Sequence, residues 1–106
     1  MTNEASTTAD DLPIDDLLII DDDEPFRVRL GRAMEKRGYR VVLAGSVKAA
    51  VAAAERERPA CAVVDLRLGD GSGLDVVQAL RRHAPDARVV VLTGDRKSTR
   101  LNSSHQ

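Results

Sequence analysis

Apolar and polar positions divide the middle of the chain into seven alternating segments. Four of them are short, mostly apolar segments that predict strands, at residues 17–20, 39–44, 60–65 and 88–92. The run at residues 17–20 is apolar throughout, which is typical of a strand that is buried on both faces of a sheet. The three segments between them repeat apolar residues at intervals of three and four, which predicts helices. This order of strands and helices, with short connections, predicts a parallel sheet with right-handed crossovers.

The predicted helices carry sequence signals at their ends and along their inner faces. Pro25 suits the first turn of the first helix, and Gly38 ends it. Ser46 is a typical N-cap for the second helix, and Pro85 follows the third. The inner faces are predicted to be Phe26, Leu30, Ala33 and Met34 in the first helix, Val47, Ala50, Val51 and Ala54 in the second, and Val76, Val77, Leu80 and Ala84 in the third.

A glycine-bearing loop at residues 66–72 connects the third strand to the third helix. Asp70 and Gly71 have the chemistry of a turn. The loop lacks the lysine of a P-loop, so a phosphate cradle is not expected there.

The size and composition of the chain fit one globular domain. It has 106 residues, of which 42% are hydrophobic and 31% charged, and its formal net charge of −1 disfavours a nucleic-acid-binding face. Cys61 is the only cysteine, which excludes a disulfide framework, favours a reducing cytoplasm and predicts a small buried hydrophobe. No apolar run approaches the roughly 20 residues that cross a bilayer, so we expect a cytoplasmic domain without membrane contact.

Both ends of the chain differ from this pattern. Residues 1–16 are rich in Thr, Ala and Asp, without periodicity, and predict a flexible acidic N-terminal segment. Residues 95–105 look like the in-frame translation of a common sequencing adapter. We therefore expect a truncated domain at residues 17–94, a non-native tail at residues 95–106, and a natural chain that continues past Gly94.

Polar side chains follow three of the predicted strands, at the edge where a parallel sheet places its chemistry. Asp21, Asp22 and Asp23 follow the first strand, Asp65 ends the third, and Thr93 follows the fourth. Mg²⁺ prefers oxygen ligands, and like charges this close are unfavourable without a cation. One acid, Asp23 or its neighbour, is expected to cap the next helix, but capping needs only one. The sequence thus predicts a Mg²⁺-binding, phosphoryl-accepting pocket.

The residues at these strand ends resemble the receiver domain of two-component response regulators. The resemblance covers about residues 16–94 and rests on the acids at 21–23, Asp65, Gly73 eight residues later, and Thr93 with Gly94. Residues 31–39 and 65–74 are similar to the PrrA/RegA/ActR type, which are redox-responsive regulators with a helix-turn-helix effector. The resemblance implies a flavodoxin-like (CheY-like) α/β fold, a doubly wound parallel sheet with four of the family's five strands, in the order 2-1-3-4.

The resemblance also implies a role for each site residue. Asp65 would be the phosphoacceptor, taking a phosphoryl group from a sensor histidine kinase. Asp21 and Asp22 would bind Mg²⁺, with Asp65 and the backbone carbonyl of Arg67 completing the shell. Thr93 would hydrogen-bond the phosphate and switch a transcriptional output, although a strand-end hydroxyl also suits a bond to local backbone. The implied protein is a phosphorylated signalling module, not an enzyme.

Parts of the family pattern are missing from the sequence. No lysine stands at the end of a fifth strand, because Lys97 is only four residues past Thr93. The fourth helix, fifth strand and fifth helix are also absent, and the usual dimerisation face with them. DNA contact is therefore expected only through a missing C-terminal effector. Gly69 stands where the family often has a proline.

Two other functions fit part of the same residues. A haloacid-dehalogenase-like phosphohydrolase would use Asp21 as its nucleophile, Asp23 in an Asp-x-Asp motif, and Thr93 as a second hydroxyl. That hypothesis leaves Asp65 without a role. The third hypothesis is an interaction fragment that never takes up phosphate. The aspartate that receives a phosphoryl group distinguishes the first two hypotheses.

Overall fold

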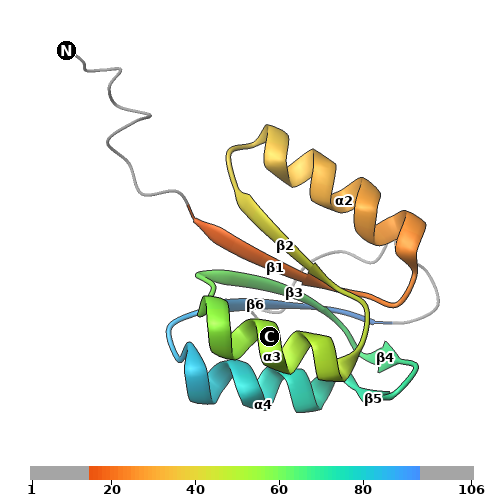
Figure 1. Ribbon diagram of the computed structural model, residues 1–106, viewed down its shortest axis with the longest axis vertical. Coiled ribbons are helices and arrows are strands. Elements are labelled where there is room, and N and C mark those ends of the chain that lie inside the picture. The colour runs from red at the N-terminus through yellow and green to blue at the C-terminus, as the bar shows by residue number, and fades with distance from the viewer. Residues whose placement is uncertain (1–14, 94–106) are drawn as a thin grey trace.

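The computed structural model describes residues 15–93 and shows a four-stranded parallel sheet (Figure 1). Its strands are β1 (Asp16–Ile20), β2 (Arg40–Ala44), β3 (Cys61–Asp65) and β6 (Arg88–Leu92), in the order β2-β1-β3-β6. The predicted α/β class and the order 2-1-3-4 are confirmed, with β6 as the fourth strand of this sheet. Most of the predicted acidic segment, Gly94 and the predicted tail lie outside the described residues.

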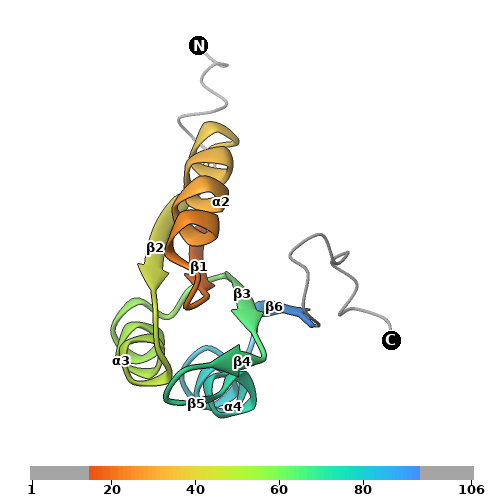
Figure 2. The ribbon, with the colours of Figure 1, turned by 90° about the vertical axis from the view of Figure 1, so that its right-hand side faces the viewer.

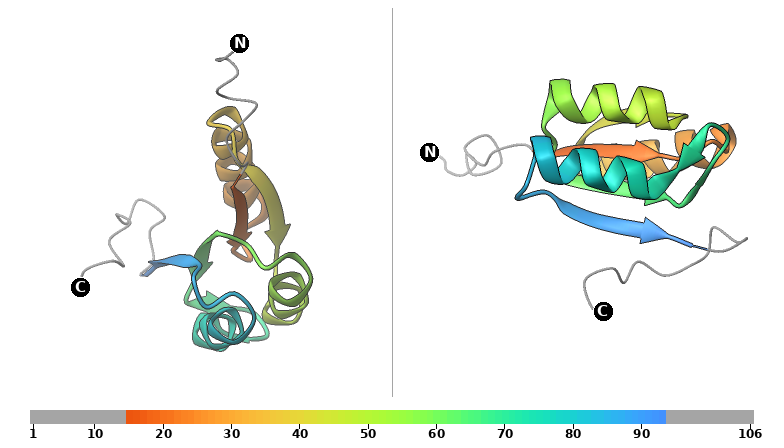
Figure 3. Two further views of the ribbon diagram at one scale, coloured as in Figure 1. Left: turned by 90° about the vertical axis from the view of Figure 1, so that its left-hand side faces the viewer. Right: turned by 90° about the horizontal axis from the view of Figure 1, so that it is seen from below.

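Three helices cover the two faces of the sheet. α2 (Glu24–Lys36) lies against one face, and α3 (Val47–Glu57) and α4 (Gly73–His83) lie side by side against the other (Figure 2). The strands all run in one direction, so the carboxyl ends of β1, β3 and β6 meet at one edge (Figure 3, right). Within residues 15–93, no helix is long and apolar enough to cross a membrane.

Each face of the sheet buries its own aliphatic core, because successive strand residues point to opposite faces. The core on the α3 and α4 side includes Leu18, Ile20, Val64, Val76 and Leu80. The core on the α2 side includes Leu17, Ile19 and Val63, with Phe26, Leu30 and Met34 packed against them. Because the chain has only two aromatic residues, its core consists mainly of aliphatic side chains. Each fully buried Leu or Ile contributes about 1.5–3 kcal/mol to folding.

The inner faces of the helices are only partly as predicted. Ala33, Val51 and Ala84 lie outside both cores, whereas Gly31, Ala53 and Ala79 are buried without having been predicted. α3 and α4 pack against each other as well as against the sheet, so their buried sectors are wider than one apolar stripe. Gly31 faces β2 so closely that a Cβ atom would lie 3.1 Å from the Leu43 side chain.

The predicted helix ends agree with the structure. Asp23 caps α2 through a bond from the Phe26 amide to its Oδ1 (3.1 Å), and Ser46 caps α3. Gly38, just after α2, has a φ of 101°, which favours glycine. The end of α3 was not predicted: Arg58 adopts the left-handed conformation there, with φ 47°.

The loop after β3 contains a small antiparallel hairpin that was not predicted. Its strands are β4 (Arg67–Leu68) and β5 (Gly71–Ser72), and Leu68 pairs with Gly71. The turn residues are therefore Gly69 and Asp70, one position earlier than predicted. Leu68 is 8% exposed and packs into the core beneath α3 and α4, which ties the hairpin to the domain.

Candidate metal centre

Asp21, Asp22 and Asp65 lie together at the carboxyl edge of the sheet. In the pairing of β1 with β3, Ile20 lies opposite Val64, so the residue that follows each of them is carried to the same place. The backbone of Asp21 continues the sheet, because its amide donates to the Ala44 carbonyl (3.1 Å). One carboxylate oxygen from each of the three acids lies within 4.8 Å of the other two.

Two of these acids are buried. Asp21 is 0% exposed and Asp65 is 3% exposed, whereas Asp22 is open to solvent. Buried like charges repel, and a carboxylate removed from water needs compensation. Backbone amides give part of it: Asp23 donates to Asp21 Oδ1 at 2.9 Å, and Arg67 donates to Asp65 Oδ1 at 3.1 Å. A hard divalent cation fits this set of oxygen donors and would compensate the remaining charge.

Arg27 on α2 contacts the loop that follows β1 and carries Asp21 and Asp22, called here the first acidic loop. The sequence alone did not predict this contact. Its Nη1 donates to the backbone carbonyl of Asp21 at 2.7 Å. The same nitrogen lies against Gly45, where a Cβ atom would come within 2.9 Å of it. The available signals were an arginine one helical turn after the acid run and a glycine directly after β2.

Gly73 determines the shape of the second acidic loop, the segment that follows Asp65 at the end of β3 and leads to α4. A Cβ atom at this position would lie 2.9 Å from both Leu66 Cα and Val64 Cγ1, and closer still to the Asp65 carbonyl oxygen. Only glycine therefore allows the first turn of α4 to approach the end of β3 in this way. The Gly73 amide donates to the Leu66 carbonyl at 2.9 Å, which closes the loop.

Arg67 and Thr93, the other two predicted site residues, belong to neighbouring segments of the same edge. Arg67 opens β4, two residues after Asp65, and its amide bonds that carboxylate. Asp65 pairs with Leu92 of β6, and Thr93 follows directly as an exposed residue. Their roles toward a metal and a phosphate stay predictions.

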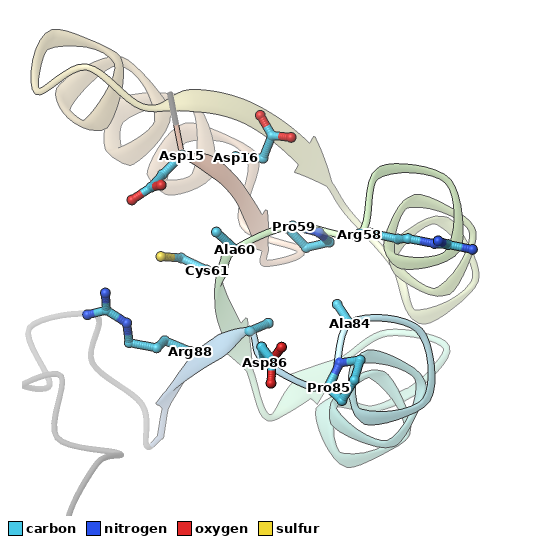
Figure 4. Close-up of a pocket in the computed structure, with 11 residues that line it drawn as sticks. Asp15, Asp16, Arg58, Pro59, Ala60, Cys61, Ala84, Pro85, Asp86 and Arg88 are labelled. Atoms are coloured by element: carbon cyan, nitrogen blue, oxygen red, sulfur yellow. The ribbon is translucent and has the colours of Figure 1, made fainter. Parts of the chain in front are cut away.

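The described part of the chain also has a pocket at the opposite, amino-terminal edge of the sheet (Figure 4). It measures about 540 Å³, and its lining includes Asp16, Cys61, Asp86 and Arg88. Cys61 is half-buried there rather than buried as predicted, because it lies at the start of β3. Burial raises the pKa of its thiol, although the positive charge of Arg88 opposes the shift. The pocket is separate from the acid cluster, and its thiol is protonated at neutral pH.

Known proteins with similar sequences share the region that carries the acid cluster. Residues 17–104 of the chain match the response regulator receiver domain family. The photosynthetic apparatus regulatory protein RegA of Rhodovulum sulfidophilum is 63% identical over 78 residues, covering 74% of this chain and 43% of RegA. The acid tolerance regulatory protein ActR of Sinorhizobium medicae is 55% identical over 82 residues, covering 77% of this chain and 42% of ActR.

A solved structure has the same fold. It is a response regulator protein from Burkholderia pseudomallei with a phosphorylated aspartic acid, a calcium ion and citrate. It matches with a TM-score of 0.73 and 41% sequence identity, covering 77% of this chain and 48% of that chain.

Fold and site together define a doubly wound α/β domain with a carboxylate cluster where the strand order reverses, between β1 and β3. The chain belongs to the response regulator receiver domain family, the signalling modules of two-component systems. The phosphohydrolase alternative is not favoured, since it gives no role to Asp65. The chain spans less than half the length of the curated relatives that it matches.

Proposed function

We propose that Asp65 accepts a phosphoryl group from a sensor histidine kinase. We also propose that Asp21, Asp22, Asp65 and the backbone carbonyl of Arg67 hold Mg²⁺ for this transfer. The observation that carries the proposal is the grouping of three carboxylates, two of them buried, at one edge of the sheet. The phosphorylated aspartic acid and the calcium ion of the Burkholderia pseudomallei relative support it. Mg²⁺ suits a site with few carboxylates, waters and an incoming phosphate.

The proposed transfer forms one bond and breaks another. A carboxylate oxygen of Asp65 attacks the phosphorus of phosphohistidine, and the phosphorus–nitrogen bond breaks. The imidazole leaves with the bonding electrons and takes up a proton from water, while Asp65 becomes an acyl phosphate. Bound Mg²⁺ would supply positive charge beside the phosphoryl oxygens. The Arg67 amide, which already bonds Asp65, orients the attacking carboxylate.

The proposed output is a change of transcription, produced outside this chain. Thr93, at the end of β6, would hydrogen-bond the new phosphate and so couple it to the chain that follows. DNA would be bound by a C-terminal effector of the whole protein, in keeping with the regulatory names of RegA and ActR. We propose the cytoplasm as its location, where the single thiol stays reduced.

Intact-mass analysis after incubation with acetyl phosphate and Mg²⁺ tests this function. The wild-type chain should gain the mass of one phosphoryl group, and Asp65→Asn should not. Asp86→Asn is the matched control: it removes an exposed acid at the opposite edge of the sheet and should leave the gain unchanged. Chelation of Mg²⁺ should abolish the gain.

Other outcomes of this experiment would contradict the proposal. A mass gain that survives in Asp65→Asn and maps to Asp21 would instead support the phosphohydrolase chemistry. No gain in the wild-type chain would favour the interaction fragment that never takes up phosphate.

A further inference from the structure

Asp70 links the β4–β5 hairpin to a helix that begins 23 residues earlier. Its Oδ1 accepts a hydrogen bond from the Val47 amide at 2.7 Å, and its Oδ2 accepts one from the Lys48 amide at 3.2 Å. The next amide, that of Ala49, donates to Ser46 Oγ at 3.1 Å. Asp70 therefore satisfies two of the amides that the start of α3 leaves without partners in the helix. These two bonds also lower the pKa of Asp70.

The same hairpin leads directly to the acid cluster. Its first residue is Arg67, whose amide donates to Asp65 Oδ1 at 3.1 Å. Gly71 packs on the first residue of α3, since a Cβ atom at Gly71 would lie 3.2 Å from Val47 Cγ2. The hairpin thus contacts Asp65 through its first residue, Arg67, and contacts α3 through Asp70 in its turn. Figure 1 shows the hairpin at the edge where α3 and α4 begin.

We propose that Asp70 is a positioning residue of the metal centre. By fastening the hairpin turn to the start of α3, it fixes the backbone of Arg67, whose amide orients Asp65 and whose carbonyl would bind the cation. Asp70 itself is exposed and belongs to the hairpin turn rather than to the acid cluster. The inference rests on the proposed function, because it assumes the cation site at Asp65 and Arg67.

A purely structural role would be the simpler explanation, because Asp70 also caps a helix. Ser46→Ala separates the two roles. It removes a cap from the same end of α3 but leaves both bonds of Asp70, and therefore the attachment of the hairpin, in place. Asp70→Asn keeps one acceptor oxygen, whereas Asp70→Ala keeps none.

The test is a Mg²⁺ titration of the whole 106-residue chain, followed by the backbone amide NMR signals of residues 65–68. Asp70→Ala should raise the dissociation constant for Mg²⁺ about tenfold, as the loss of a supporting contact behind metal ligands does. Asp70→Asn should lie between this variant and the wild type, and Ser46→Ala should stay within about twofold of the wild type. Without metal, the Arg67 amide should exchange its hydrogen faster in Asp70→Ala than in Ser46→Ala.

Unchanged Mg²⁺ affinity in Asp70→Ala would overturn the inference, and so would an equal loss in Ser46→Ala. If Asp70→Ala does not fold, the comparison of Asp70→Asn with Ser46→Ala decides. A wild-type chain that binds no Mg²⁺ also overturns it. A wild-type chain that binds Mg²⁺ but gains no phosphate in the mass experiment contradicts the proposed function alone, and the affinities then still decide the role of Asp70.

Discussion

Asp21 and Asp65 face the same point from neighbouring strands, and both carboxylates are buried. Each carboxylate accepts a hydrogen bond from the backbone amide two residues later, so both loops stabilise their buried charge in the same way. These amides do not remove the mutual repulsion of two charges in the interior. We therefore expect the acid cluster to lower the stability of the metal-free domain.

The first prediction is that Asp21→Asn stabilises the metal-free domain. It removes one of the two buried charges and keeps a side-chain oxygen for the Asp23 amide. We expect the free energy of unfolding in EDTA to rise by about 1 kcal/mol. Urea unfolding with and without Mg²⁺ measures this, and Mg²⁺ should stabilise the wild-type chain more than the variant. Asp22→Asn, at the exposed acid, is the control and should change stability in EDTA less; a destabilised Asp21→Asn in EDTA would contradict the argument.

The second prediction concerns Gly73. Gly73→Ala forces a methyl group against the backbone of the loop after β3, at 2.9 Å from Leu66 Cα. Overpacking of this kind should lower the free energy of unfolding by about 1–3 kcal/mol. Gly69→Ala is the matched control, because a Cβ atom there has nothing within 4 Å and the backbone of Gly69 is not in the left-handed region. Equal effects of the two substitutions in urea unfolding would refute the packing argument.

The third prediction concerns the end of α3. Arg58 adopts a left-handed backbone conformation with φ 47°, which costs a residue with a Cβ atom about 1–2 kcal/mol relative to the helical region. Arg58→Gly should raise the thermal midpoint, by relieving up to about 1 kcal/mol after the flexibility that glycine adds to the unfolded chain. Arg56→Gly, inside the helix, should lower it instead. A lower midpoint in both variants would show that the conformation of Arg58 is not strained.

The fourth prediction is a pH dependence from Asp70. Because the pKa of Asp70 is lower in the folded state, its carboxylate stabilises the domain above the ordinary carboxyl pKa of about 3.9. That stabilisation is lost as the pH falls through the lower, folded value. The wild-type chain should therefore be more stable than Asp70→Asn at pH 7, and the difference should shrink toward pH 3. A difference that is constant between these two pH values in urea unfolding would exclude a charge-dependent anchor.

The sequence predicts those features that neighbouring residues determine. The runs at residues 17–20 and 60–64 are apolar on both faces, so their burial and strand character follow directly. The acids after them share an edge once the strands are parallel. Ser46 and Gly38 act within one helical turn of their own positions, and both were predicted correctly.

Contacts between distant residues were not predictable in this way. Asp70 reads as a turn residue, and its bonds to Val47 and Lys48 depend on how two separate loops meet. No sequence pattern singles out Arg27, and only the fold brings it to the Asp21 carbonyl and to Gly45. The buried Ala53 was missed because α3 packs on α4 as well as on the sheet, a contact that periodicity within one helix cannot reveal.

The connection between β2 and α3 receives contacts from both acidic loops. The Ala44 carbonyl accepts from the Asp21 amide, Arg27 rests on Gly45, and Asp70 bonds the Val47 amide. One additional residue of any type in this connection would move Gly45 away from Arg27 or the Val47 amide away from Asp70. The length of this connection is thus constrained as well as its composition, which Gly45 and Ser46 already restrict. The turn around Gly38 lies at the opposite end of β2 from the acids, so we expect an added residue there to disturb them less.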